Sequence, residues 1–285
     1  MLDFTETIVR YLTGRKGHQL DTVIMNFKPI CQPGDDMNNL INQKLLELNQ
    51  LADPSALLPA LFPEASELVV NDPYAFCIAA CLDRGAKSEM ICTIPYWMKE
   101  RLGHLDPFKI GQMPLDELSA LVNSLPKKPR YIHDTPKTIR DITRIIVENY
   151  QGNAALIWTD KNAYDVKRVF LSVHGVGTGI SNMILLIIEK TYHIRFSDLD
   201  HQRMDIKPDV HTRRVLYRLG VAAVNDQNDE AINAARQLNP SFPGEIDGAL
   251  WLIGRQWCTN TNPTCSQCPM RDVCAKVDVN HGIAD

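Results

Sequence analysis

Four cysteines near the end of the printed sequence have a spacing that could bind metal. Cys258, Cys265, Cys268 and Cys274 form the pattern C-x6-C-x2-C-x5-C in a segment rich in Pro, Thr and Asn. Four thiolates are the usual ligands of a [4Fe–4S] cluster, and they also bind structural zinc. Two C-x2-C pairs would favour zinc, but this segment has one such pair and uneven outer gaps. The spacing therefore favours an iron–sulfur cluster, with zinc as the alternative.

Disulfide bonds are a third possibility for the same cysteines. We recognise no signal peptide, and no apolar run approaches the roughly 20 residues of a membrane span. We therefore expect a cytoplasmic protein without membrane association, in which thiols stay reduced. The other four cysteines, Cys31, Cys77, Cys81 and Cys92, lie mostly among apolar residues, and we interpret them as small core residues.

A second candidate site is the glycine-rich segment L-S-V-H-G-V-G-T-G-I-S-N-M, residues 171–183. Gly175 and Gly177 flank Val176 between two helical patterns, which is the arrangement of a helix-hairpin-helix, and Gly179 follows. Glycine permits a positive φ and the close approach of another backbone. Exposed amides at the start of the second helix could then bind a phosphate. An ordinary pair of helices joined by a tight turn is the alternative.

An aspartate lies at the start of the next helical pattern, K-P-D-V-H-T-R-R-V-L-Y-R-L-G. Pro208 fixes the approach, Asp209 falls at the first turn, and Gly220 is placed to end the helix. An N-cap role, contributing about 1 kcal/mol, is adequate for Asp209 taken alone. A carboxylate at a helix N-terminus could also stabilise a cationic transition state or orient a nucleophile.

The remaining sequence must position these groups, and its pattern is helical almost throughout. A chain of 285 residues with 45% hydrophobic residues can bury a large core. A formal net charge of −4 argues against coating nucleic acid by bulk charge but permits a local basic face. We predict helices at Phe4–Leu12, Asp36–Leu51, from Asp72-Pro73 onward, Ser88–Leu102, Pro114–Ser124, Thr135–Tyr150, Ala163–Ser172, Ser181–Tyr192, Val210–Leu219, Asp229–Leu238 and Gly244–Trp257.

The order of these motifs resembles that of a known family. A helix-hairpin-helix, a D-x-H-x-x-R-V helix start and the terminal cysteine segment occur in this order in the iron–sulfur branch of the endonuclease III-like helix-hairpin-helix DNA glycosylases. The resemblance covers roughly residues 70 to 276. It implies an all-α protein in which two helical domains flank a DNA-binding cleft. The expected domains are a six-helix barrel with the hairpin, 70–203, and a cluster domain formed by 1–69 and 204–285.

The resemblance also implies roles for individual residues. The four cysteines would bind a [4Fe–4S] cluster. Asp209 would stabilise the charge that builds on the sugar when an N-glycosidic bond breaks, after the target base has been flipped out of the duplex. The hairpin would hold the phosphate backbone without reading sequence. The expected DNA contacts are Gly175, Val176, Gly177, Gly179, Lys207, Arg213, Arg214, Arg84 and Lys87, with Arg218 and Arg255 as further candidates. For each charged member, a solvated or internally paired side chain is an equally good account.

Two positions depart from the family's pattern. Members that also cut the strand carry a lysine two residues after the second hairpin glycine, where this chain has Gly179. Those members fill the gap left by the flipped base with a glutamine, where this chain has Gly85 between Arg84 and Lys87. The sequence therefore predicts a monofunctional glycosylase that releases a damaged or mismatched base with water. We expect that base to differ from the oxidised pyrimidines handled by endonuclease III itself.

Other interpretations stay open at this stage. One is a bifunctional glycosylase and abasic-site lyase that uses Lys161, Lys167 or Lys207. Another is a non-catalytic DNA-binding protein of the same fold. The adenine-mismatch branch also lacks the lysine but has a further C-terminal domain, whereas this sequence ends eleven residues after Cys274. We expect a monomer that acts on double-stranded DNA, with a base pocket shaped by residues near 35–45, 83–90 and 131–140.

Overall fold

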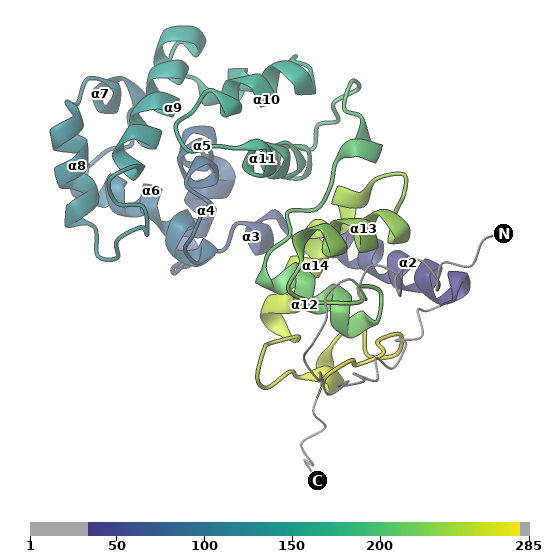
Figure 1. Ribbon diagram of the computed structural model, residues 1–285. Coiled ribbons are helices and arrows are strands. Elements are labelled where there is room, and N and C mark those ends of the chain that lie inside the picture. Colours follow the sequence, from purple (N-terminus) through teal and green to yellow (C-terminus); the bar gives the residue numbers. More distant parts are fainter. Residues whose placement is uncertain (1–33, 280–285) are drawn as a thin grey trace, which may run out of the picture. The chain divides into compact units, whose positions relative to one another are not determined.

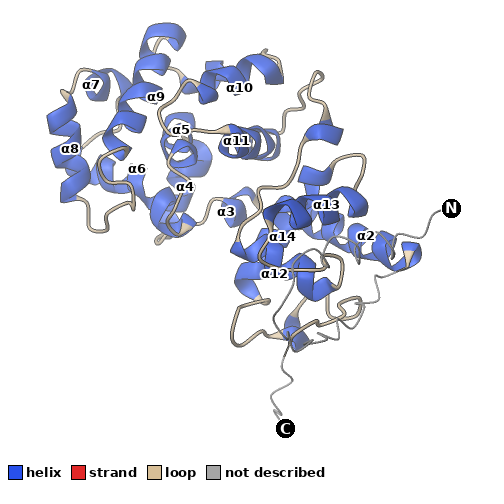
Figure 2. Ribbon diagram, viewed as in Figure 1, coloured by secondary structure: helices blue, strands red, loops and turns tan. Residues whose placement is uncertain are grey.

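The computed structural model describes residues 34–279, and within this range the chain forms helices and no strand (Figure 2). The all-α prediction is confirmed for these residues. The predicted helix Phe4–Leu12 and Cys31 lie outside the described residues. None of the helices between residues 34 and 279 is both long enough and apolar enough to cross a membrane.

Helix bounds follow the sequence signals closely wherever the apolar period is long (Figure 1). The α-helices are α2 (Asp35–Leu51), α3 (Pro54–Leu57), α4 (Pro63–Asn71), α5 (Pro73–Cys81), α6 (Ser88–Leu102), α7 (Pro107–Gly111), α8 (Leu115–Ser124), α9 (Thr135–Tyr150), α10 (Ala163–Leu171), α11 (Thr178–Thr191), α12 (Val210–Leu219), α13 (Asn228–Leu238) and α14 (Asp247–Gln256). Short 3-10 helices are η1 (Ala154–Ile157), η2 (His201–Arg203), η3 (Pro243–Ile246) and η4 (Cys265–Gln267). The helices α3, α4 and α7 were not predicted; α3 and α7, with four and five residues, are too short to show a clear period.

One predicted helix, Gly244–Trp257, is in fact two elements. The first turn is the 3-10 helix η3, and α14 begins only at Asp247. The amide of Gly244 donates to the carbonyl of Met204 at 2.6 Å, and a Cβ on Gly244 would lie 2.8 Å from that oxygen. This close approach holds Gly244 against the chain before α12, so α14 starts after it.

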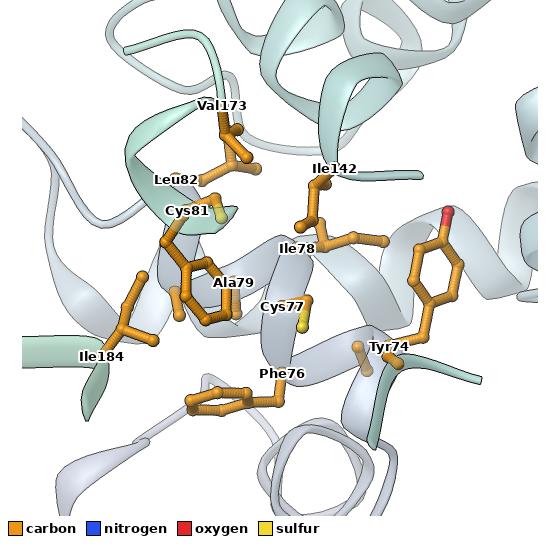
Figure 3. Close-up of a cluster of buried hydrophobic side chains, with 14 of the residues drawn as sticks. Tyr74, Phe76, Cys77, Ile78, Ala79, Cys81, Leu82, Ile142, Val173 and Ile184 are labelled. Carbon is orange, nitrogen blue, oxygen red and sulfur yellow. The ribbon is translucent and has the colours of Figure 1, made fainter. Parts of the chain in front are cut away.

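The first hydrophobic core surrounds α5, which lies among α4, α6, α9 and α11 (Figure 1). Every residue of α5 from Tyr74 to Cys81 is buried. Figure 3 labels six of these side chains together with Ile142, Val173 and Ile184: Tyr74, Phe76, Cys77, Ile78, Ala79 and Cys81. The Tyr74 hydroxyl is satisfied by Thr143 Oγ1 at 2.6 Å. Cys77, Cys81 and Cys92 are buried core residues, as predicted, and burial raises the pKa of each thiol.

A second core joins α2 to α12, α13 and α14 and lies under the cysteine segment. Ile41 and Leu45 of α2 are fully buried against residues of the three later helices. The described residues fall within one compact unit that contains both cores. The division into domains at 70–203, and at 1–69 with 204–285, stays a prediction.

The helices α12 and α14 pack closely because α14 carries glycine where it meets α12. A Cβ on Gly254 would lie 2.7 Å from His211 Cβ and 3.0 Å from both the Cα and the carbonyl oxygen of His211. The helix α12 itself ends at Gly220, whose φ of 85° is in the left-handed region. The contact at Gly254 therefore sets how near α14 lies to the residues that begin α12.

Gly254→Ala is expected to destabilise the fold by about 1–3 kcal/mol, because the new methyl group overlaps backbone atoms that cannot move alone. Urea unfolding followed by circular dichroism measures the change. Gly179→Ala is the matched control: it also lies in a helix, a Cβ there meets nothing within 4 Å, and its effect should be neutral or stabilising by up to about 1 kcal/mol. Equal losses for the two variants would contradict the packing argument.

Candidate functional site

A pocket of about 1220 Å³ is lined by residues of the first core and by residues at the ends of α2, α12 and α14, the helices that also build the second core. Asp209 and Asp247 contribute carboxylates, and Lys207 contributes an amine. Of the three segments expected to shape the pocket, 83–90 lines it through residues 83–89, whereas 35–45 and 131–140 contribute no lining residue. The lining residues nearest to the last two segments are Asn49 and Gln50 of α2 and Arg130 before α9, because inward side chains of α2 and α9 are used in the two cores.

Asp209 begins α12 as its N-cap. Its Oδ1 accepts the amides of His211 at 2.7 Å and Thr212 at 2.9 Å, and its own amide donates to Thr212 Oγ1 at 2.9 Å. These bonds form a capping box. Every hydrogen bond recorded for the carboxylate within residues 34–279 goes to Oδ1. The cap therefore fixes the carboxylate of a residue that lines the pocket, and it leaves Oδ2 out of the capping bonds.

Lys207 lies two residues before Asp209 and is paired inside the pocket. Its Nζ is 2.7 Å from Asp83 Oδ2 and 3.2 Å from the Asp83 carbonyl oxygen, and the side chains of the pair are 30% and 21% exposed. Lys207 thus ties the end of α5 to the start of α12. The predicted phosphate contact for Lys207 stays a prediction, and the structure gives its amine a partner within the protein.

Asp247, the first residue of α14, is the second carboxylate beside Asp209. Its Oδ1 accepts the backbone amide of Lys207 at 3.2 Å. Burial, followed by the negative charge of Asp209, raises the pKa of Asp247 to about 7, although Lys207 acts in the opposite direction. Near neutral pH, a substantial fraction of this carboxyl group is therefore protonated.

A planar cation and an aromatic ring form another wall of the pocket. The Arg255 guanidinium lies over the Trp251 ring, 4.4 Å from its centroid, and pairs with Glu89. Arg255 was a candidate for phosphate contact, and here it is bound internally. Sequence reasoning missed Trp251, Glu89 and Asp247. The i, i+4 spacing of Trp251 and Arg255 on a predicted helix was the one signal available, since nothing local marks the other two.

The hairpin joins α10 to α11, and its glycines differ in conformation. Gly175 has φ of 80°, whereas Gly177 is extended at φ −103° and serves as the N-cap of α11. The expectation of a positive φ holds for Gly175 alone. No side chain caps α11, and a Cβ on Gly177 or Gly179 would meet nothing within 4 Å. The Val176 side chain is buried in the first core, so it anchors the turn from within.

Arg84 connects the pocket loop to this hairpin. A Cβ on Gly175 would overlap its guanidinium, which donates to Thr138 Oγ1 at 2.9 Å and lies over the Tyr131 ring. Thr138 Oγ1 in turn donates to the carbonyl of His174 at 2.8 Å. Arg84 is thus a brace for the hairpin, while the Lys87 side chain beyond it is exposed.

Gly85, next to Arg84, has φ of 67°. A Cβ there would lie 2.7 Å from the Tyr131 ring. A residue with a side chain would therefore be strained at this position and would displace Tyr131. This local geometry favours glycine at position 85.

The four cysteines of the terminal segment line one small pocket under α12 and α14. Burial raises the pKa of Cys268 to about 11 and raises that of Cys274 above its usual value. Within the part of the chain that is described, no group of three or more His, Cys, Asp or Glu side chains is arranged to share one metal ion. In a four-iron cluster each thiolate binds a different iron, so the four ligands need not converge on one ion. The donor set and its shared pocket fit such a cluster.

Two arginines of α12 hold this segment in place. Arg214 donates to the carbonyls of Cys258 at 2.6 Å, Gly254 at 2.7 Å and Val210 at 2.9 Å. Arg218 donates to the carbonyls of Thr259 and Asn260 at 2.6 and 3.0 Å and approaches Cys258 Sγ at 3.5 Å. Both side chains are buried. Arg214, predicted to contact DNA, is therefore committed to the protein interior.

Arg213 takes no part in the hydrogen bonds that Arg214 and Arg218 make to the cysteine segment. Its Nη1 donates to the carbonyl of Asp226 at 3.2 Å and to Asn228 Oδ1 at 3.0 Å. It lines neither of the two pockets described above. Its predicted contact with DNA stays a prediction.

Arg214→Met is expected to destabilise the fold by about 3 kcal/mol, because three carbonyls lose their donor and two of them lie in the tightly packed region of α12 and α14. Urea unfolding of the full chain measures it. Arg203→Met is the control, since the Arg203 side chain is 88% exposed and its pair with Asp200 should contribute less than about 1 kcal/mol. A loss of similar size in both variants would contradict the role given to Arg214.

Comparison with known proteins places the fold. No family model matches the chain. A candidate DNA repair glycosylase of Methanocaldococcus jannaschii is 24% identical over 173 residues, which cover 60% of this chain and 71% of that protein. Endonuclease III of Thermotoga maritima is 26% identical over 137 residues, which cover 48% of this chain and 54% of that enzyme.

Among solved structures, a trapped covalent intermediate of endonuclease III with DNA superposes with a TM-score of 0.54. Its sequence identity is 17%, and the match covers 84% of this chain and 96% of that one. The chain thus has the all-helical endonuclease III fold, and its homologues and structural neighbours are members of the endonuclease III and DNA glycosylase family.

Proposed function

We propose that this protein is a DNA glycosylase of base-excision repair. It hydrolyses the N-glycosidic bond of a damaged or mismatched base that has been flipped out of double-stranded DNA, and it does so without cutting the strand. The observation that carries the proposal is Asp209, a carboxylate fixed by its cap at the wall of a 1220 Å³ pocket. The homologues, which point to a DNA repair glycosylase, support it. A monomeric, cytoplasmic protein is part of the same proposal.

The chemistry requires a fixed negative group beside the sugar. As the bond between C1′ and the base breaks, positive charge builds on the sugar ring. Two amides hold Asp209 Oδ1, so Oδ2 meets that charge without first having to reorganise. The same oxygen can accept a proton from the water that attacks C1′. The pocket is larger than a single base needs, which leaves room for the extruded nucleotide.

The hairpin supports DNA as the partner. The first amides of α11 have no side-chain cap, and open space surrounds the Cα atoms of Gly177 and Gly179. A phosphate can therefore approach this helix start closely, aided by the helix dipole. Such contacts position the duplex without reading its sequence. The buried Val176 and the Arg84 brace hold the turn in one conformation before DNA arrives.

A second candidate function, a lyase that cuts the strand, is favoured by the position of Lys207. Of the three lysines considered from sequence, Lys161 and Lys167 do not line the pocket and Lys207 does. Its amine, however, is paired with Asp83. Borohydride trapping with abasic DNA separates the two functions: a covalent complex that disappears in Lys207→Met would establish the lyase and defeat the monofunctional proposal.

Asp209→Asn is expected to slow base release by at least about 100-fold while DNA binding persists, because asparagine keeps the N-cap but loses the charge. Single-turnover excision and fluorescence anisotropy measure the two properties. Asp106→Asn is the matched control: Asp106 caps α7 through two amides in the same way, and it lies outside the pocket. Excision at the normal rate in Asp209→Asn would contradict the catalytic role.

We infer that Cys258, Cys265, Cys268 and Cys274 bind a [4Fe–4S] cluster. Their shared pocket and their C-x6-C-x2-C-x5-C spacing support this inference, with structural zinc as the alternative. When bound, the cluster supplies a covalent crosslink of the terminal segment. Arg214 and Arg218 link the terminal segment to α12, the helix that Asp209 begins, through hydrogen bonds to its carbonyls.

Purified protein should therefore be brown and contain about four iron and four sulfide per chain. Cys268→Ser is expected to lower the iron content and the stability together, whereas Cys92→Ser should leave iron unchanged because Cys92 is buried in the first core. Elemental analysis and visible absorption check both. Colourless protein with one zinc per chain would overturn the assignment.

A further inference from the structure

Asp247 lies beside Asp209 but comes from a different helix. It is the first residue of α14, which packs against α12, and it lines the same pocket. Its Oδ1 accepts the amide of Lys207, two residues before Asp209. The contact at Gly254 and the Arg214 bonds fix the spacing of the two helices. The two carboxyl groups are therefore held at one wall of the pocket by independent constraints.

The charges around Asp247 are unbalanced. Asp209 at the start of α12 and Asp83 after α5 are negative, and the nearest cation, Lys207, is already paired with Asp83. The other titratable groups that line the pocket are Glu245, His211, Glu189, Lys190, Arg195, Arg84, Lys87, Arg130, Glu89 and Arg255, and the last two are paired with each other. Lys190 donates to the carbonyl of Asn49 on α2. Burial and the charge of Asp209 raise the pKa of Asp247 to about 7.

We propose that Asp247 is a second catalytic residue, which donates a proton to the departing base. This inference rests on the proposed glycosylase function. Asp209 and Asp247 then divide the work of the site between a charged carboxylate and a neutral carboxylic acid. Two carboxyl groups in different environments are a recurrent solution for glycosidic bonds, because one must be an acid while the other stays an anion.

The step balances without any further reagent. The bond between C1′ and the base nitrogen breaks, and its electron pair goes to the base. The proton of Asp247 moves to the base, which leaves as a neutral molecule. Water adds to C1′ and loses a proton to Asp209 Oδ2, and transfer of that proton to Asp247 restores the starting state. The substrate class follows: a base that is a poor leaving group as an anion and has a nitrogen or oxygen that can accept a proton.

Asp247→Asn tests the inference through the pH dependence of excision. Asparagine keeps an acceptor for the Lys207 amide but has no proton to donate. Wild-type kcat/KM for base release should fall about tenfold per pH unit above about pH 7. The variant should be about 100-fold slower at pH 6 and should lack this alkaline limb. Its defect should shrink on an electron-poor analogue of the released base, which needs less protonation to leave.

Asp35→Asn is the matched control, since Asp35 is also the first residue of a helix, is exposed and lies outside the pocket. It should retain the wild-type profile. An alkaline limb that persists unchanged in Asp247→Asn would overturn the inference while leaving the glycosylase proposal intact. Failure of the wild type to release any base would overturn both.

Stability gives a readout that needs no substrate. The pKa of Asp247 is raised in the fold from 3.8 to about 7, so ionising it costs stability. The free energy of unfolding of the wild type should therefore fall as pH rises from about 4 to 7. The free energy of unfolding of Asp247→Asn, relative to that of the wild type, should rise across the same interval and stay constant above it. A stability difference that does not change with pH would show that Asp247 holds no proton and would overturn the inference.

Discussion

Two buried guanidinium groups tie the chemistry of this protein to its fold. Arg214 and Arg218 lie on α12 and donate to backbone carbonyls of the cysteine segment and of α14. Buried carbonyls need such partners, and buried guanidinium groups need such acceptors. These bonds join α12, which Asp209 begins, to the cysteine segment and to α14. The position of the Asp209 carboxylate therefore depends on the structure of the cysteine segment.

The pocket depends on the same arrangement, because its polar groups come from segments far apart in the sequence. Asp83 follows α5, Lys207 and Asp209 precede and begin α12, and Asp247 begins α14. The pair between Asp83 and Lys207 uses the one cation nearest the carboxylates. Burial and the nearby negative charge both raise the pKa of Asp247.

Local signals in the sequence were sufficient for the helices and for part of the site. The bounds of α6, α9 and α12 match the prediction; α9 and α12 have a clear apolar period, and Gly103 and Gly220 mark the ends of α6 and α12. Asp209 and the four cysteines could be identified as candidates because each lies in a motif of nearby residues in the sequence.

The rest depends on tertiary contacts that no local pattern records. In the sequence, Asp247 and Glu89 are ordinary acidic residues in the first turn of a helix. Only the packing of α14 and α6 shows that both line the pocket. Arg214 and Lys207 looked like surface cations, but packing gives both internal partners.

The most direct test of the central claim is a panel of duplexes bearing uracil, thymine mismatches, hypoxanthine, alkylated purines or oxidised bases, scored for release with and without alkali. The account predicts release of at least one free base, with strand breaks only after alkali; intact DNA across the whole panel, or breaks without alkali, would contradict it.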